Sequence, residues 1–297
     1  MITGWLIVNE FLHSQKFTEL HGYILEAAKR QGIMMLLKTN AEVLIDLRRE
    51  HCEKYEVDFI LFWDKDVRLA RYLEQMGYPV FNSSQAIECC DDKSLAHLTL
   101  HRAGIVMPDT IVAPMTFSNI GFTNLAFLEE MEDRIGFPMV VKECFGSFGQ
   151  QVYLVKDLRE LQTKVLQIGG RPLLFQAFIS SSFGRDIRLQ VVGDQVIAAM
   201  YRYSENGDFR ANVTNGARMK KYEPTVEQCE LALKCCKIIG LDFAGVDLLF
   251  GKEEEPIVCE VNSNAHFKNI YDCTGVNAAD CIILYILDCL AKGRGKR

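Results

Sequence analysis

LDFAGVDLLF at residues 241–250 and PIVCEVNSN at residues 256–264 are the two stretches that decide the fold. Each stretch is short, apolar and bounded by turn-forming residues, and GKEEE separates them. This pattern predicts two antiparallel strands joined by a loop.

The register of this hairpin places two acidic residues opposite each other. With the loop at the centre of symmetry, the pairs are Phe250 with Ile257, Leu248 with Cys259, and Asp247 with Glu260. Asn262 follows on the same face of the strand as Glu260. Like charges opposed on a sheet are destabilising, so the pattern favours a positive partner between the two carboxylates.

Two carboxylates and an amide oxygen form a hard ligand set. Asp247, Glu260 and Asn262 therefore suit Mg²⁺ or Mn²⁺ better than zinc. Because Mg²⁺ usually takes phosphate oxygens as well, the hairpin suggests a nucleotide site. The alternative is that Asp247 ends a strand at the surface and Glu260 is an exposed strand residue.

The composition is that of a globular protein with two or three packed units: the chain has 297 residues, of which 49% are hydrophobic and 24% charged. A net charge of −6 argues against nucleic acid as the main partner. The 11 cysteines include no C-x-x-C pair and indicate a reducing compartment. The N-terminal apolar run predicts a strand rather than a signal peptide, and no run reaches the roughly 18 apolar residues of a membrane span. We therefore expect a cytoplasmic protein with no membrane partner.

Residues 1–90 alternate between strand and helix patterns. Strands are predicted at 4–9, 33–37, 57–63 and 79–81, and helices at 17–28 and 67–76. Strands separated by helices imply parallel pairing with right-handed crossovers, so we predict a small α/β domain. No glycine fingerprint follows the first strand, so nothing in this domain indicates a nucleotide site.

A helix is predicted to begin at a capping aspartate, Asp91 or Asp92, and to end at Gly104. Within it, His97 and His101 have the spacing of a helical metal pair. No glutamate follows His97, and we interpret both as exposed or half-buried side chains.

FPMVVKECFGSFGQQVYLV at residues 137–155 predicts two strands around a glycine loop. Gly146, Ser147 and Gly149 would let backbone N–H groups lie over phosphates, which Lys142 can reach from the end of the first strand. A plain turn between two strands is the alternative.

Arginine is dense between residues 185 and 212. Arg188 and Arg202 lie inside the apolar strands of a predicted hairpin, where a guanidinium without a partner would be costly. Converging guanidinium groups suit phosphate and carboxylate oxygens, so we interpret these two arginines as functional. Surface solubility is the alternative.

Seven motifs, taken in order, resemble one known fold. They are D-D-K at 91–93, V-V-K at 140–142, G-R-D-I-R at 184–188, V-V-G-D-Q-V-I-A-A-M at 191–200, G-D-F-R-A-N at 207–212, A-G-V-D at 244–247 and E-V-N at 260–262. Together they resemble the ATP-grasp fold, and more closely the RimK-like glutamate ligases. The resemblance implies an α/β and α+β architecture of three parts: an N-terminal parallel-sheet domain at 1–90, a central subdomain with the lid at 91–180, and a C-terminal subdomain with the metal site at 181–297.

The resemblance also implies roles for individual residues. Lys93 and Lys142 would neutralise ATP phosphates, and Asp247, Glu260 and Asn262 would hold Mg²⁺ or Mn²⁺, as two ions. The implied catalytic residues are Arg202, Arg210, Arg188 and Asn212, of which Arg202 and Arg210 would hold the transferring phosphoryl group. The lid would comprise Gly146, Ser147, Phe148 and Gly149, and the hinge that holds adenine would comprise Gln176, Phe178 and Ile179.

Two stretches depart from the family pattern. Ala177 stands in the hinge where relatives usually carry glutamate, so adenine would be bound by main-chain groups of Gln176 and Ile179. EVNSNAHFKNI stands where relatives commonly read E-V-N-x-S-P-G, so we expect an unusual acceptor, with His266 and Lys268 as candidate contacts. Ordinary helix-start residues are the alternative for these two.

The implied activity is a two-step ligation, in which ATP phosphorylates a carboxylate and an amine then displaces phosphate. We expect L-glutamate or a similar amino acid to be joined to a carboxyl-bearing acceptor, which is a small molecule, a peptide or a protein tail. A kinase of the same fold and a nucleotide-binding module without turnover are the alternatives. We expect the protein to form a homodimer or a homotetramer, as the resemblance to this family implies.

Overall fold

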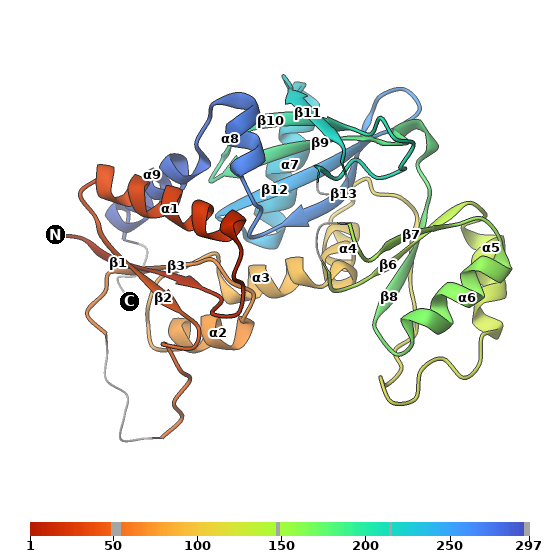
Figure 1. The fold of residues 1–297 in the computed structure, drawn as a ribbon, viewed down its shortest axis with the longest axis horizontal. Coiled ribbons are helices and arrows are strands. Elements are labelled where there is room, and N and C mark those ends of the chain that lie inside the picture. The colour runs from red at the N-terminus through yellow and green to blue at the C-terminus, as the bar shows by residue number, and fades with distance from the viewer. Residues whose placement is uncertain (49–54, 147–148, 214–215, 294–297) are drawn as a thin grey trace.

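The structure is a computed structural model that describes residues 1–48, 55–146, 149–213 and 216–293. Within these ranges the strands form three sheets, with the orders β2-β1-β3-β4, β5-β8-β6-β7 and β11-β10-β9-β12-β13. The first sheet lies at one end of the molecule and the second at the other, with the third between and above them (Figure 1). The strands of each sheet fall within one of the three predicted domains, whose boundaries stay a prediction.

The N-terminal sheet is parallel throughout, as predicted. Its elements are β1 (Thr3–Val8), α1 (Gln15–Arg30), β2 (Met34–Thr39), β3 (Phe59–Phe62), α2 (Val67–Gln75) and β4 (Val80–Phe81). A short helix that we did not predict, α3 (Ser84–Asp91), follows β4, and the Ser83 hydroxyl caps it by accepting a hydrogen bond from Ala86 N.

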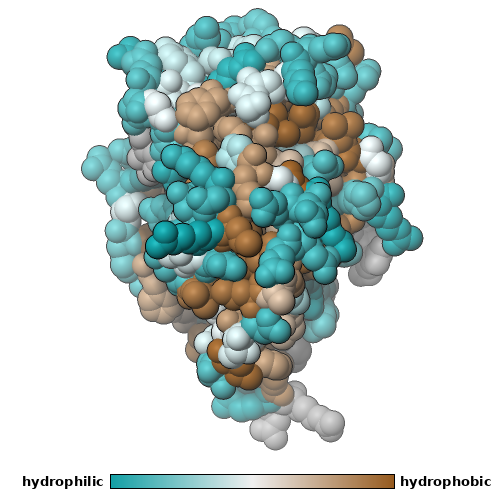
Figure 2. Space-filling view, turned by 90° about the vertical axis from the view of Figure 1, so that its right-hand side faces the viewer, coloured by the Kyte–Doolittle hydropathy of each residue, from teal (hydrophilic) through white to brown (hydrophobic). Residues whose placement is uncertain are grey.

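The central sheet is antiparallel and carries the glycine loop between β6 and β7. Its elements are α4 (Lys93–Arg102), β5 (Thr110–Val112), the 3₁₀ turn η1 (Ala126–Leu128), α5 (Glu129–Arg134), β6 (Met139–Glu143), β7 (Val152–Val155), α6 (Leu158–Ile168) and β8 (Leu173–Ala177). Asp92 caps α4 by accepting hydrogen bonds from the backbone N–H groups of Ser94 and Leu95, which confirms one of the two predicted caps. Figure 2 views this end of the molecule, where hydrophobic residues form a band bordered by hydrophilic ones.

The C-terminal sheet has β9 as its middle strand, with β10 and β12 on either side. It contains β9 (Arg185–Val192), β10 (Gln195–Tyr203), β11 (Arg218–Lys221), β12 (Phe243–Phe250) and β13 (Pro256–Asn262), and it is accompanied by η2 (Ser180–Ser182), α7 (Val226–Ile239), α8 (Lys268–Thr274) and α9 (Ala278–Ala291). The predicted hairpin of β9 and β10 is present, with antiparallel pairing. Strand β11, with the polar sequence RMKK, was not predicted.

The register of the β12–β13 hairpin differs from the predicted one over half its length. Phe250 pairs with Pro256 and Leu248 with Val258, so two of the three predicted pairs are wrong. The register then shifts between Leu248 and Asp247, and Asp247 lies opposite Glu260 as predicted. The shift is a β-bulge that accommodates Cys259 as one extra residue in β13.

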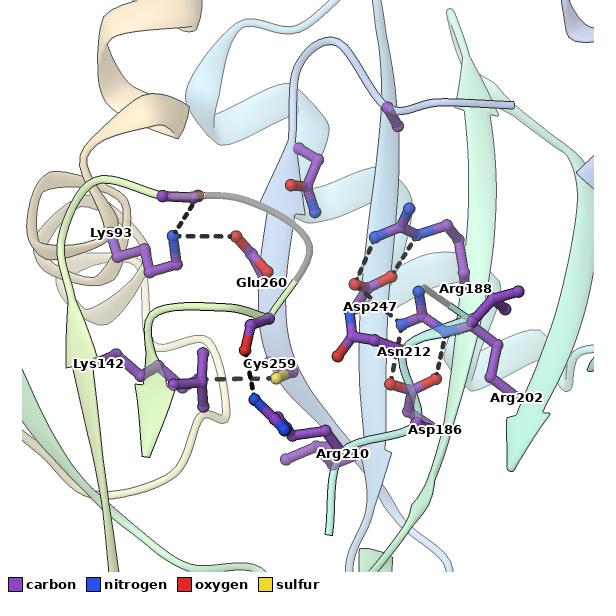
Figure 3. A pocket seen from close by; sticks show the side chains of 18 of the residues that line it. Lys93, Lys142, Asp186, Arg188, Arg202, Arg210, Asn212, Asp247, Cys259 and Glu260 are labelled. Carbon is purple, nitrogen blue, oxygen red and sulfur yellow. Dashed lines mark hydrogen bonds and ion pairs between the residues drawn. The ribbon is translucent and has the colours of Figure 1, made fainter. Parts of the chain in front are cut away.

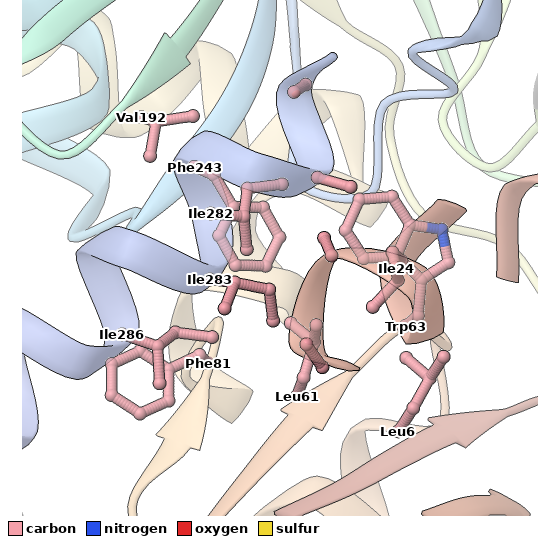
Figure 4. Close-up of a cluster of buried hydrophobic side chains, with 14 of the residues drawn as sticks. Leu6, Ile24, Leu61, Trp63, Phe81, Val192, Phe243, Ile282, Ile283 and Ile286 are labelled. Atoms are coloured by element: carbon pink, nitrogen blue, oxygen red, sulfur yellow. The ribbon is translucent and has the colours of Figure 1, made fainter. Parts of the chain in front are cut away.

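An apolar cluster joins the N-terminal sheet to the C-terminal part of the chain (Figure 4). Isoleucines of α9 converge there with Leu61 of β3 and Phe243 of β12, and the Trp63 ring stacks on Phe243 at a centroid distance of 5.4 Å. Asn82 reinforces the junction, because its buried side-chain amide donates to Phe243 O and accepts from Phe243 N.

Within the described ranges no single helix is long and apolar enough to span a membrane. Helices α8 and α9 reach that length and apolar composition only when taken together, and the pair is bent by 112°.

Phe243 is 1% exposed, so we expect F243A to lower the free energy of unfolding by about 3–5 kcal/mol through loss of burial and creation of a cavity. F11A is the matched control, since Phe11 is 75% exposed and its truncation should change stability by less than about 0.5 kcal/mol. Urea unfolding followed by tryptophan fluorescence measures both variants. Equal losses in the two would contradict the assigned core.

Candidate functional site

The predicted site residues meet in one cleft between the central and C-terminal sheets. The cleft is lined by Lys93, Lys142, Gly146, Gly149, Gln176, Phe178, Ile179, Arg188, Arg202, Arg210, Asn212, Asp247, Glu260, Asn262 and His266. Ser147 and Phe148 lie outside the described residues. Lys268 is not among the described residues that line the cleft, and its ammonium pairs with Asp272 on its own helix at 2.6 Å.

Four charged side chains alternate in sign across β9, β10 and β12 (Figure 3). Arg202 binds Asp186 through two hydrogen bonds of 2.6 and 2.8 Å and reaches Asp247 at 3.0 Å. Arg188 binds the same Asp247 through two hydrogen bonds of 2.6 Å. The Arg202 side chain is only 5% exposed, so this ion-pair network is largely out of contact with solvent.

The network shifts the pKa values of its acids in opposite directions. Burial alone would raise the pKa of Asp247, but Arg188 and Arg202 outweigh burial and hold this pKa below its ordinary value. Burial raises the pKa of Asp186 despite its contact with Arg202. The positive partner that we expected between Asp247 and Glu260 is thus supplied, for Asp247, by two guanidinium groups.

Two buried lysines lie at the opposite wall of the cleft. Lys93, the first residue of α4, donates to Gly146 O at 3.1 Å and lies 3.4 Å from a Glu260 oxygen. Lys142, in β6, lies 3.8 Å from Cys259 Sγ (Figure 3). The two lysines are 8% and 6% exposed. Two buried ammonium groups in one cleft favour an anionic ligand.

The glycine loop touches the arginine-rich segment across the cleft. Arg210 donates to Gly149 O at 2.7 Å and also pairs with Asp208 at 2.8 Å. A Cβ atom at Gly149 would lie 2.7 Å from Asn212 Oδ1, and the φ angle of Gly149 is +70°, so this close approach needs glycine. Gly146 and Gly149 therefore line the cleft, and Gly149 lies against Arg210 and Asn212 of the C-terminal part of the chain.

The hinge and the histidine behind it form a buried polar contact. Gln176 donates to Thr110 Oγ1 at 2.9 Å, and its amide nitrogen lies 3.4 Å from His97 Nε2. His97 is 7% exposed, with Nδ1 3.1 Å from Met107 Sδ. Burial, together with Lys142 and Lys93, lowers the pKa of His97 to about 3.

The predicted metal ligands, Asp247, Glu260 and Asn262, provide only part of the coordination that a metal ion needs. Across the described ranges no group of three or more His, Cys, Asp or Glu is arranged to hold a metal ion. Asp247, Glu260 and the Asn262 amide do line one cleft, and the amide nitrogen of Asn262 is buried without a hydrogen-bond partner in that part of the chain. Two carboxylates and one amide fit a hard cation that completes its coordination with phosphate oxygens.

Three functional candidates escaped the sequence reasoning. Asp186 holds Arg202, and its position two residues before Arg188 in a strand was a signal that both face the same side. Cys259 is placed in the cleft by the bulge, and Asn264 lines the cleft beyond Asn262. Neither had a signal that single-sequence reasoning can use.

Known proteins similar to this chain share its fold. A model of the RimK-like ATP-grasp domain matches residues 90–286. N-acetylaspartylglutamate synthase A of Homo sapiens is 35% identical over 69% of this chain and 51% of its own length, and a probable alpha-L-glutamate ligase of Trichodesmium erythraeum is 35% identical over 76% of this chain and 73% of its own length. The solved structure of D-alanine–D-alanine ligase from Bacillus anthracis complexed with ATP superposes with a TM-score of 0.76 at 19% identity, covering 100% of this chain and 99% of that one.

The low pKa of His97 makes a testable contribution to the pH dependence of stability. Between its ordinary value of 6.5 and the folded value of about 3, the unfolded chain binds a proton that the folded chain does not. This proton lowers the free energy of unfolding as pH falls, by up to about 1.4 kcal/mol per pH unit. We expect H97Q, compared with wild type by urea unfolding from pH 7 to 5, to lose stability less steeply. Parallel pH profiles would contradict the buried neutral imidazole.

Proposed function

The chain belongs to the RimK-like ATP-grasp family and is an ATP-dependent ligase, and from that premise we propose that it joins an amine to a carboxylate through an acyl phosphate. The predicted family and the predicted ATP-grasp fold are thereby confirmed. The observation that carries the proposal is that two lysines, a paired arginine network and the acidic hairpin all line one cleft.

The lysine wall binds the phosphates of ATP. Lys93 and Lys142 are buried and point into the cleft from α4 and β6, so their charges act where water screens them least. The hinge residues Gln176, Phe178 and Ile179 bind adenine, with main-chain groups serving in place of the glutamate that Ala177 replaces.

The acidic hairpin holds the metal. Asp247, Glu260 and Asn262 would hold a Mg²⁺ ion, which would supply positive charge to the phosphates when bound. Lys93 beside Glu260 keeps this carboxylate next to the phosphate-binding wall. A second ion, or Mn²⁺ in place of Mg²⁺, remains part of the proposal.

The arginines stabilise the group in transfer. In the first step the γ-phosphoryl group of ATP is transferred to a carboxylate oxygen, and the bond between the γ-phosphorus and the leaving group ADP breaks. In the second step the amine attacks the acyl carbon, the C–O bond to phosphate breaks, and the amine loses its extra proton. Arg202 is held by Asp186 and Asp247, so its charge is already oriented when negative charge builds up on the phosphoryl group. Arg210 and Asn212 line the same cleft and would contact the group in transfer.

The lid protects the intermediate, because acyl phosphates hydrolyse in water. Arg210 holds the lid by donating to Gly149 O. The residue that would contact the phosphoryl group therefore also keeps the lid closed over it. We propose that the amine belongs to L-glutamate or a similar amino acid, since the names of two relatives describe a glutamate ligase and an N-acetylaspartylglutamate synthase. The acceptor class and a homodimeric or homotetrameric state stay predictions.

The products test the function. Purified protein is incubated with ATP, Mg²⁺, each amino acid and a pool of small carboxylates, peptides and cell extract, and the products are read by mass. We expect equal amounts of ADP and free phosphate and a mass gain of one amino-acid residue. ADP without free phosphate, with a phosphorylated product, would replace the ligase by a kinase.

E260Q removes one negative charge from the metal-binding hairpin while keeping the shape of the side chain. We expect ADP formation to fall by roughly 100-fold or more. Mutating a residue that only hydrogen-bonds to a metal ligand usually lowers metal affinity or activity by about 10- to 100-fold, and Glu260 is proposed as a ligand itself. E223Q is the matched control, since the Glu223 side chain is 82% exposed. Full activity of E260Q would exclude Glu260 from the metal set.

A further inference from the structure

Three polar residues alternate along the chain where β13 continues toward α8. Asn262, Asn264 and His266 are half-buried and line the cleft, whereas the residues between them are buried. This is the stretch that departs from the family pattern. Beyond the metal-binding hairpin, the cleft is therefore lined by side chains particular to this sequence.

The N-terminal domain fixes the orientation of two of these side chains. Asn264 donates through its amide nitrogen to Asp64 O at 2.8 Å. His266 Nε2 lies 3.2 Å from Lys16 O, and since a carbonyl only accepts, Nε2 carries the ring proton. Burial lowers the pKa of His266 to about 4, so near neutral pH its other nitrogen, Nδ1, carries a lone pair.

The opposite ends of these side chains have no protein partner. Asn264 Oδ1 and His266 Nδ1 are both buried and accept no hydrogen bond from the part of the chain that the structure describes. Buried polar atoms in native proteins usually have a partner, so two orphan acceptors on residues that line one cleft indicate a ligand that donates hydrogen bonds. Of the substrates of a carboxylate–amine ligase, the amine is the donor.

Positive charge lies beside these acceptors. Lys16 and Arg188 both line the cleft. They lie near enough for Arg188, after burial, to lower the pKa of Lys16. A carboxylate would meet these two cations, and an α-amino acid carries a carboxylate and an amino group on the same carbon.

We propose that Asn264 Oδ1 and His266 Nδ1 accept hydrogen bonds from the amino group of an α-amino acid, whose carboxylate faces Lys16 and Arg188. The inference rests on the proposed ligase function and names the subsite of its amine substrate. It places the attacking nitrogen beside Asn264 and His266, which follow the proposed metal ligand Asn262 along the chain. His266 is a specificity-determining residue that contacts the substrate.

The test compares ligands that differ only in the amino group. Wild type loaded with ADP and Mg²⁺ is titrated calorimetrically with each of the common α-amino acids, and the tightest is compared with its des-amino counterpart, which is glutarate for L-glutamate. We expect the amino acid to bind about 10-fold more tightly, as for one or two lost hydrogen bonds. H266Q keeps a donor toward Lys16 O but lacks the Nδ1 acceptor, and it should reduce this preference to less than about 3-fold.

H21Q is the matched control, because His21 lies on α1 and lines a separate depression, and it should keep the full preference. Unchanged ADP affinity in H266Q shows that the variant is folded. The proposal is overturned if no α-amino acid binds wild type, if the des-amino acid binds equally well, or if H266Q keeps the preference. If the amino acid binds through its amino group but no amide forms, the proposed ligase function is wrong and the proposed subsite is retained.

Discussion

The site depends on a buried chain of alternating charges, Asp186, Arg202, Asp247 and Arg188. Burying any one of them alone would cost several kcal/mol, and removing one member leaves its partners unpaired in a poorly solvated place. The network crosses β9, β10 and β12, so the same contacts that neutralise the charges also align the three strands. Arg202 is thereby held in one orientation at the cleft before any ligand arrives. Such preorganised charge is the form of electrostatic stabilisation that needs least rearrangement during reaction.

A single bulge determines which side chains accompany this network. Because strand residues alternate between faces, the extra residue at Cys259 moves every later residue of β13 to the opposite face. Glu260 and Asn262 reach the cleft through this shift, and Asn264 and His266 line the cleft from the segment that follows β13. The proposed metal site on the β12–β13 hairpin thus depends on one local irregularity.

Sequence reasoning recovered features that depend on residue type and order. Alternating strand and helix patterns gave the parallel N-terminal sheet, and ordered motifs gave the family and the residues that meet in the cleft. It failed where tertiary contacts decide. The symmetric loop predicted the wrong pairs for Phe250 and Leu248 because composition does not reveal a bulge. Sequence reasoning also did not reveal that Arg188 and Arg202 from neighbouring strands pair with Asp247. The proximity of Lys16 to His266 links residues 250 positions apart.

The central claim is that the carboxylate is activated by phosphoryl transfer before the amine attacks. The most direct measurement labels both oxygens of the carboxylate substrate with ¹⁸O and analyses the phosphate released during amide formation by mass. If an acyl phosphate forms, the oxygen that bridged carbon and phosphorus leaves with phosphate, and we expect one ¹⁸O atom in each phosphate. Unlabelled phosphate released together with amide would contradict the mechanism, because the carboxylate oxygen would then never have been bonded to phosphorus.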